Sequence, residues 1–121
     1  MIDVMNNERA EIAMTDLPTV LITGASTGIG ATYAARFAGR GHDLVLVARD
    51  QERMDGLAAE LRTQTGVSID VIRADLTQPD DLGGVASRLR DDSRIGVLLN
   101  NAGANVAGAF VKQSTEESSS P

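Results

Sequence analysis

Small residues are concentrated in one short stretch of the chain, Thr23-Gly24-Ala25-Ser26-Thr27-Gly28-Ile29-Gly30. An apolar run, 19–23, precedes the stretch and an Ala-rich run, 31–38, follows it, so we expect a strand, a tight turn and a helix. Small residues let the backbone approach a phosphate, which free N–H groups and the positive end of the helix then hold. A purely structural turn is the competing interpretation, because glycines also serve turns and close packing. The flanking strand and helix favour a site for a phosphate-bearing ligand, and the lack of a closing Gly-Lys-Ser/Thr argues against a P-loop NTPase.

A second position with chemical meaning is Arg49, which directly follows the apolar run 44–48 and stands nineteen residues beyond Gly30. In dinucleotide-binding folds this position reads the adenosine ribose. An acidic residue there accepts hydrogen bonds from a free 2′-hydroxyl, whereas an arginine pairs with a 2′-phosphate. Arg49 therefore predicts NADP(H) rather than NAD(H). The neighbouring Asp50 keeps NAD(H) open, and a solvated arginine at a helix start is the plain alternative.

Two further polar segments follow the later apolar runs. Asp75-Leu76 comes after the third run, and Asn100-Asn101-Ala102-Gly103 ends the fourth. Ligands of open α/β folds collect at the carboxyl ends of the strands, so both segments belong on the side of the glycine loop. Taken singly, Asp75 is more often a turn or helix-cap residue than a ligand contact, and Asn100 is more often a hydrogen-bonding group at a strand end.

The remaining polar residues predict neither a catalytic group nor a metal site. The chain has no cysteine and one histidine, His42, which we expect in a turn at the opposite edge of the sheet from the glycine loop. The acidic pairs Asp80-Asp81 and Asp91-Asp92 fall at expected helix ends, where capping and solvated roles are usual.

Apolar runs and segments of helical spacing alternate along the chain. We expect strands over 19–23, 44–48, 67–74 and 95–99, and helices over 31–38, 49–65 and 82–89. Strands alternating with helices of this length indicate right-handed crossovers between parallel strands. The prediction is an α/β fold with a doubly wound parallel sheet in the strand order 3-2-1-4.

Composition narrows the range of partners. The net charge of −6, with arginines scattered along the chain, argues against binding to nucleic acid. No apolar stretch approaches the roughly 20 residues that cross a bilayer. We therefore expect no membrane partner and a cytoplasmic protein.

The four motifs TGASTGIG, LVLVARD, ADLT and NNAG together resemble the N-terminal half of short-chain dehydrogenases/reductases, in the family's order and spacing. The resemblance implies an NAD(P)-binding Rossmann fold and a carbonyl/alcohol oxidoreductase. It implies that Ser26, Thr27 and Ile29 line the pyrophosphate, that Arg49 takes the 2′-phosphate, and that Asp75 and Leu76 border the adenine. It places Asn101, Ala102 and Gly103 on the ribose and nicotinamide side. The cofactor-binding set is thus Gly24, Ser26, Thr27, Gly28, Ile29, Gly30, Arg49, Asp75, Leu76, Asn101, Ala102 and Gly103.

The sequence departs from the family in the residues that carry its chemistry. Family members place a catalytic Ser and a Tyr-x-x-x-Lys pair after a fifth strand, for proton exchange during hydride transfer. Here the one tyrosine, Tyr33, has Phe37 four positions on, and the one lysine, Lys112, has Gly108 four positions before it. We therefore expect a truncated family member that is inactive alone.

The expected organisation is a disordered arm over 1–17, a dinucleotide-binding half-domain over 18–110 and a polar tail over 111–121. A fourth strand without a fifth beside it would leave an apolar edge, which predicts self-association through that edge. Two alternatives stay open. One is a non-catalytic module that binds NADP(H) or another chain; the other is a non-functional product of a frameshift or early stop, which the Ser-rich end 118–121 favours.

Overall fold

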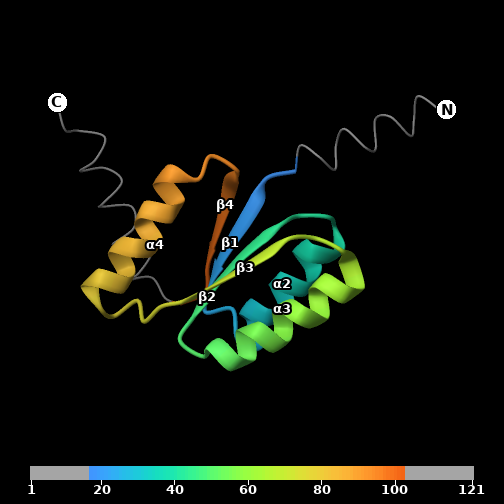
Figure 1. Cartoon of the computed structure of the whole chain (residues 1–121), viewed down its shortest axis with the longest axis horizontal. Coiled ribbons are helices and arrows are strands. Elements are labelled where there is room, and N and C mark those ends of the chain that lie inside the picture. Colours follow the sequence, from blue (N-terminus) through green and yellow to red (C-terminus); the bar gives the residue numbers. More distant parts are fainter. Residues whose placement is uncertain (1–16, 103–121) are drawn as a thin grey trace.

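The computed structural model of the chain describes residues 17–102. Strands and helices alternate along it: β1 (Thr19–Thr23), α2 (Gly28–Gly39), β2 (Leu44–Ala48), α3 (Gln51–Thr65), β3 (Ile69–Arg73), α4 (Pro79–Asp91) and β4 (Ile95–Asn100) (Figure 1). The predicted polar tail, nearly all of the predicted arm and the last part of the predicted half-domain lie outside these residues. Those boundaries therefore stay predictions.

The strands form one parallel sheet in the order β3-β2-β1-β4, which confirms the predicted topology. β1 is central, and its Ile22 lies opposite Leu46 of β2 and Leu99 of β4. Because the strands are parallel, their carboxyl ends meet at one edge of the sheet. The loops that follow β1, β2, β3 and β4 therefore converge there.

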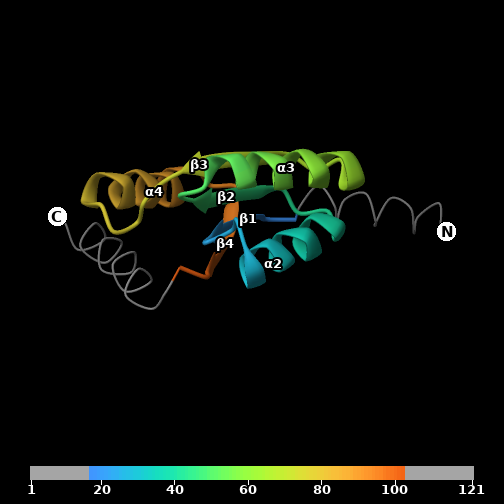
Figure 2. The same ribbon diagram turned by 90° about the horizontal axis from the view of Figure 1, so that it is seen from below.

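Helices cover both faces of the sheet (Figures 1 and 2). Successive strand residues point to opposite faces. Val20 and Leu46 accordingly belong to the core shared with α2 and α3, whereas Leu21 and Val47 belong to the core shared with α4. Every residue of β1 and β2 is buried, which explains why both strands are continuous apolar runs and not alternating ones. Each large apolar side chain buried this way stabilises the fold by roughly 1.5–3 kcal/mol.

The helix starts differ from those expected. α2 begins at Gly28, three residues before the predicted 31, and α4 begins at Pro79, three residues before the predicted 82. Apolar spacing marks a helix only where apolar side chains line its buried face, and residues 28–30 and 79–81 provide no such side chain. Pro79 suits that turn because its missing N–H would have no helical partner there. α3 begins two residues later than expected, because Asp50 is its N-cap and accepts a hydrogen bond from the backbone N–H of Arg53 at 3.1 Å.

His42 lies in the turn between α2 and β2, as expected. Its Nδ1 is 2.8 Å from the Pro18 carbonyl oxygen, and its ring meets the Phe37 ring edge-on at 5.3 Å. The histidine thus connects the segment before β1 to the end of α2 at the amino-terminal side of the sheet, away from the glycine loop.

β4 lies at one edge of the sheet, and within residues 17–102 it pairs with β1. Val97 and Leu99 pack on the side of α2 and α3, Ile95 packs on the side of α4, and Leu98 is 38% exposed. Self-association through this edge stays a prediction. In the part of the chain that the structure describes, no helix is both long enough and apolar enough to cross a membrane.

An ion cluster connects α4 to its neighbours at the amino-terminal side of the sheet. Arg88 donates hydrogen bonds to Asp70 of β3 at 2.7 Å and to Asp92 at 3.0 Å, and Arg94 donates to Asp92 at 3.1 Å. The Arg94 side chain, then its backbone N–H and then Arg88 hold the pKa of Asp92 well below its usual value. The Asp92 side chain is 11% exposed, the least of the carboxylates in this cluster.

We expect this cluster to make folding depend on pH. An unfolded aspartate has a pKa of about 3.9. Since the pKa of Asp92 is lower in the folded chain, its carboxylate stabilises the fold above about pH 4, and that contribution is lost as the pH falls further. Asp92→Asn should lower the urea midpoint at neutral pH, and its deficit relative to the unmodified chain should shrink toward pH 3. The control is Asp55→Asn, an exposed α3 residue whose carboxylate accepts from Gln51 at 3.5 Å. A deficit of equal size at both pH values would contradict the expectation.

Candidate functional site

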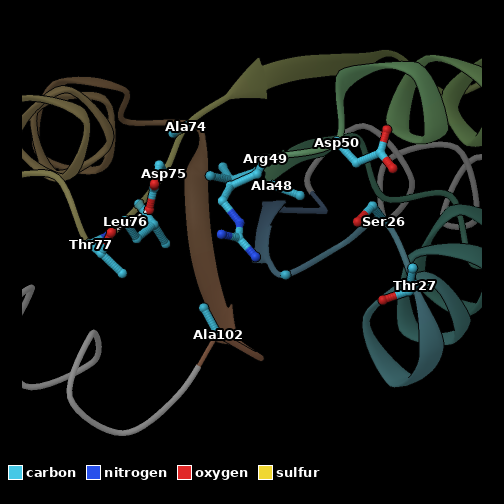
Figure 3. A pocket seen from close by; sticks show the side chains of 12 residues that line it. Ser26, Thr27, Ala48, Arg49, Asp50, Ala74, Asp75, Leu76, Thr77 and Ala102 are labelled. Carbon is cyan, nitrogen blue, oxygen red and sulfur yellow. Dashed lines mark hydrogen bonds between the residues drawn. The ribbon is translucent and has the colours of Figure 1, made fainter.

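A pocket of about 730 Å³ opens at the carboxyl edge of the sheet. Its walls come from the glycine loop, the end of β2, the loop after β3 and the residue after Asn101, as Figure 3 shows. The lining residues are Gly24, Ser26, Thr27, Val47, Ala48, Arg49, Asp50, Ala74, Asp75, Leu76, Thr77 and Ala102. Segments up to 78 residues apart in the chain, from Gly24 to Ala102, thus share one site.

The glycine loop makes a tight turn that depends on residues without side chains. Gly24 and Gly28 have φ values of +64° and +57°, a conformation that other residues adopt at a cost. At Gly30 a Cβ atom would lie 2.2 Å from the Gly24 carbonyl oxygen. The two glycines therefore serve the turn, and Gly30 lets the first turn of α2 lie directly against the end of β1.

The first turn of α2 is open toward an anion. Its N-cap, Thr27, has an extended backbone and makes no side-chain cap hydrogen bond, and no acidic residue stands in the first turn. Within residues 17–102 the backbone N–H groups of 28–30 make none of the backbone hydrogen bonds around the turn, and the first bond of the helix is donated by Ala31 to the Thr27 carbonyl at 3.4 Å. Unpaired donors at the positive end of a helix hold phosphate and carboxylate groups. With Ser26 and Thr27 in the pocket wall, the loop has the donors that a pyrophosphate requires.

Arg49 extends into the pocket between two of its walls (Figure 3). Its side chain lies between the Asp75–Thr77 segment and the Ser26–Thr27 segment. No other side chain of the described residues makes a hydrogen bond or ion pair with its guanidinium. Asp50, by contrast, is occupied: its carboxylate caps α3 through the Arg53 N–H and lies 3.4 Å from the Arg53 guanidinium. Among the described residues, the pocket thus holds a guanidinium that makes no hydrogen bond or ion pair, beside a carboxylate that contacts both the backbone N–H and the guanidinium of Arg53.

The loop after β3 is held in a defined turn. The Asp75 carboxylate accepts hydrogen bonds from the Thr77 hydroxyl at 2.6 Å and from the Thr77 backbone N–H at 3.0 Å. These two bonds, with weaker contributions from the charges of Arg49 and Arg73, hold the pKa of Asp75 below its usual value. Asp75 therefore presents an ionised carboxylate to the pocket at neutral pH.

A buried hydroxyl joins the ends of β1 and β4. Thr23 is fully buried and donates a 2.6 Å hydrogen bond to Asn100 Oδ1, while its oxygen accepts from the backbone N–H groups of Asn101 and Ala102 at 3.1 and 3.3 Å. Asn101 Nδ2 donates to the Gly24 carbonyl at 3.2 Å. Asn100 is thus the strand-end hydrogen bonder considered from sequence. Asn101 connects β4 to the glycine loop.

The structure brings most of the sequence-predicted residues to one pocket. Gly24, Ser26, Thr27, Arg49, Asp75, Leu76 and Ala102 line it. Gly28, Ile29, Gly30 and Asn101 do not: the two glycines shape the turn and its packing, Ile29 is 63% exposed, and Asn101 bonds to the loop. Gly103 lies outside the described residues.

Sequence reasoning missed several wall residues. Val47, Ala48, Ala74 and Thr77 line the pocket without having been predicted to. The first three stand at or just after strand ends, where the same edge rule could have found them. Thr77 has a local signal too, because an Asp followed two residues later by a threonine is typical of a side-chain-bonded turn.

With this geometry in place, comparison with known proteins identifies the family. The family model described as short chain dehydrogenase matches residues 18–120, so the chain belongs to the short-chain dehydrogenase family of oxidoreductases. A short-chain dehydrogenase from Sphingobium yanoikuyae, solved in complex with NADPH, is similar at 69% identity and a TM-score of 0.71, over 72% of this chain and 34% of that one. The bulky-bulky ketone specific alcohol dehydrogenase from Comamonas testosteroni is similar at 67% identity and a TM-score of 0.72, over 74% and 36%.

More distant relatives match the same region. The human 17-beta-hydroxysteroid dehydrogenase type 3 is 39% identical over 83 residues, which are 69% of this chain and 26% of the relative. A putative daunorubicin C-13 ketoreductase, DnrU, from Streptomyces sp. is 39% identical over 100 residues, 82% of this chain and 33% of the relative. The chain therefore spans about a quarter to a third of the length of these curated relatives.

The close approach at Gly30 gives a direct test of the loop geometry. Gly30→Ala should lower the free energy of unfolding by about 1–3 kcal/mol, the usual cost of overpacking, because the Gly24 carbonyl cannot move without disturbing β1. Gly56→Ala is the matched control: Gly56 lies inside α3 with nothing within 4 Å of an added Cβ. That change should raise the free energy of unfolding by about 0.5–1 kcal/mol. Equal urea midpoints for the two variants would show that α2 does not start against β1.

Proposed function

We propose that this chain forms the NADP(H)-binding part of a carbonyl/alcohol oxidoreductase. The observation that carries the proposal is the Arg49 guanidinium, which enters the pocket and makes no hydrogen bond or ion pair within residues 17–102. An anionic ligand would accept the hydrogen bonds that this arginine does not make within the described residues, because a guanidinium binds phosphate through paired hydrogen bonds. The NADPH complex of the relative from Sphingobium yanoikuyae supports the same assignment.

The residues present fit such a dinucleotide. Ser26, Thr27 and Ile29, with the open N–H groups of the first turn of α2, would hold the pyrophosphate. Arg49 would take the 2′-phosphate, and Asp75 and Leu76 would border the adenine. Gly24, Gly28 and Gly30 would keep the turn tight enough for the backbone to reach the phosphates. Asn101 and Ala102, with Gly103, would face the ribose and nicotinamide side.

The state of Asp50 supports NADP(H) over NAD(H). A carboxylate that reads a free 2′-hydroxyl must offer it an acceptor. The Asp50 carboxylate is already used by the α3 cap and by Arg53, and Figure 3 shows it on the far side of Arg49 from the Asp75 loop. An arginine available for a phosphate, beside a carboxylate that is already engaged, favours the phosphorylated cofactor.

The bound nicotinamide would supply or accept the hydride. The proton that accompanies it needs a separate acid or base, and these 121 residues offer no Tyr-x-x-x-Lys pair. Tyr33 lies in α2 with its ring 6.5 Å from that of Phe37, away from the pocket lining, and Lys112 lies outside the described residues. We therefore propose that this chain alone binds the cofactor without turning it over. The ketone and ketoreductase names of the relatives suggest a ketone/secondary alcohol pair as the substrate class of the whole enzyme.

Titration of the purified chain with NADPH and with NADH, followed by calorimetry, tests the proposal. We expect saturable binding with NADPH preferred. Arg49→Ala should weaken NADPH binding about 10- to 100-fold, because a hydrogen-bonded charge pair contributes about 1.5–3 kcal/mol. NADH binding should change far less, since NADH lacks the 2′-phosphate.

Arg36→Ala is the control, because Arg36 is an exposed arginine in the last turn of α2 and does not line the pocket. It should leave both affinities unchanged. Tighter binding of NADH, weakened by Asp50→Asn, would instead establish NAD(H) as the cofactor. A folded chain that binds neither dinucleotide would refute the proposed function.

A further inference from the structure

We propose that Thr77 is a positioning residue that fixes the Asp75 carboxylate so that the pocket selects an amino-bearing purine. This inference rests on the proposed function, because it concerns the adenine end of the same site. It starts from the hydroxyl of Thr77, a pocket-lining group that the cofactor assignment itself does not use.

Both hydrogen bonds from Thr77 end on the same oxygen of Asp75. The hydroxyl donates to Oδ1 at 2.6 Å and the backbone N–H donates to Oδ1 at 3.0 Å. Within residues 17–102, Oδ2 receives no hydrogen bond. Two donors on Oδ1 fix the rotation of the carboxylate and leave Oδ2 as the acceptor available to a ligand.

The backbone under Asp75 is held independently of the Thr77 side chain. The Asp75 N–H donates to Asp81 Oδ2 of α4 at 2.8 Å, and its carbonyl accepts from the Gln78 N–H at 2.9 Å. The preceding residue, Ala74, donates to the Ala48 carbonyl at 3.0 Å, which ties the loop to the end of β2 beside Arg49. Removing the Thr77 hydroxyl should therefore leave Asp75 Oδ1 with one donor in place of two, so that the carboxylate is held less firmly while the loop keeps its course.

An ionised carboxylate accepts hydrogen bonds and donates none. Adenine carries a 6-amino group, which donates, whereas hypoxanthine carries a 6-oxo group, which accepts. Hypoxanthine also carries an N1–H, which donates. A carboxylate oxygen held against the 6-position therefore attracts adenine and repels hypoxanthine. A carboxylate held less firmly can turn to the N1–H of hypoxanthine, so the discrimination between the two bases depends on Thr77.

A role confined to loop stability would behave differently. Thr77 directly precedes Gln78, the N-cap of α4, and Gln78 makes no side-chain cap hydrogen bond. If Thr77 merely kept this junction folded, its loss would weaken every ligand of the pocket by a similar factor. The ratio of two affinities therefore separates positioning from stability.

The test compares adenosine 2′,5′-bisphosphate with inosine 2′,5′-bisphosphate, each titrated into the full chain by calorimetry. Thr77→Val removes the hydroxyl at nearly constant volume, and Thr77→Ser keeps it. We expect the unmodified chain and Thr77→Ser to prefer the adenosine compound. Thr77→Val should reduce that preference about three- to tenfold, the range expected for one hydrogen bond, because the Thr77 N–H still reaches Oδ1. Should Thr77→Val fail to fold, Thr77→Ala takes its place in the same comparison.

The outcomes separate the two proposals. Equal losses for both compounds in Thr77→Val, or a preference that Thr77→Ser also loses, would overturn the positioning role while leaving cofactor binding intact. So would an unmodified chain that binds both compounds equally. An unmodified chain that binds NADPH and neither bisphosphate would overturn the inference alone. One that binds neither NADPH nor the bisphosphates would overturn the proposed function together with it.

Discussion

The organisation of the pocket depends on how closely the start of α2 lies against the end of β1. A side chain at Gly30 would clash with the Gly24 carbonyl oxygen, so the backbones of these two residues are in direct contact. That contact leaves the unpaired N–H groups of the first turn facing the carboxyl edge of the sheet. The buried Thr23 hydroxyl donates to Asn100 and accepts from the Asn101 N–H, and the Asn101 side chain donates to the Gly24 carbonyl, so the end of β4 is bonded to the same loop. The end of β1, the start of α2 and the end of β4 are therefore in contact with one another, and the pocket forms beside them.

The electrostatic character of the pocket follows from which polar groups already have partners. Asp50 and Asp75 are both carboxylates in its wall, but local structure uses them differently. Both oxygens of Asp50 serve α3 and Arg53, whereas Asp75 keeps one oxygen without a partner among the described residues. Arg49 makes no hydrogen bond or ion pair within residues 17–102. A net count of charges would make the wall acidic, yet the charged groups left for a ligand are the Arg49 guanidinium and one oxygen of Asp75.

The sequence predicted the sheet more reliably than the helices or the pocket wall. β1 and β2 match their expected bounds, because buried parallel strands are continuous apolar runs bounded by glycine and polar residues. β3 was expected to be longer, over 67–74, because Val67 and Ala74 are apolar, yet both lie outside the strand. Helix starts at Gly28 and Pro79 were missed because neither residue favours a helix by propensity; packing and missing-donor effects place them there.

In the proposed arrangement, the polar groups of the described residues act almost entirely on the adenosine and phosphate end of the cofactor. Arg49, Asp75, Thr77 and the glycine loop all lie there, whereas among residues 17–102 Ala102 is the one wall residue that follows β4. Binding energy from a remote part of a ligand can hold its reactive part in place without contacting it. These residues would therefore decide which dinucleotide is held and in what orientation. The choice of carbonyl compound and the proton transfer would depend on groups that approach the nicotinamide from elsewhere.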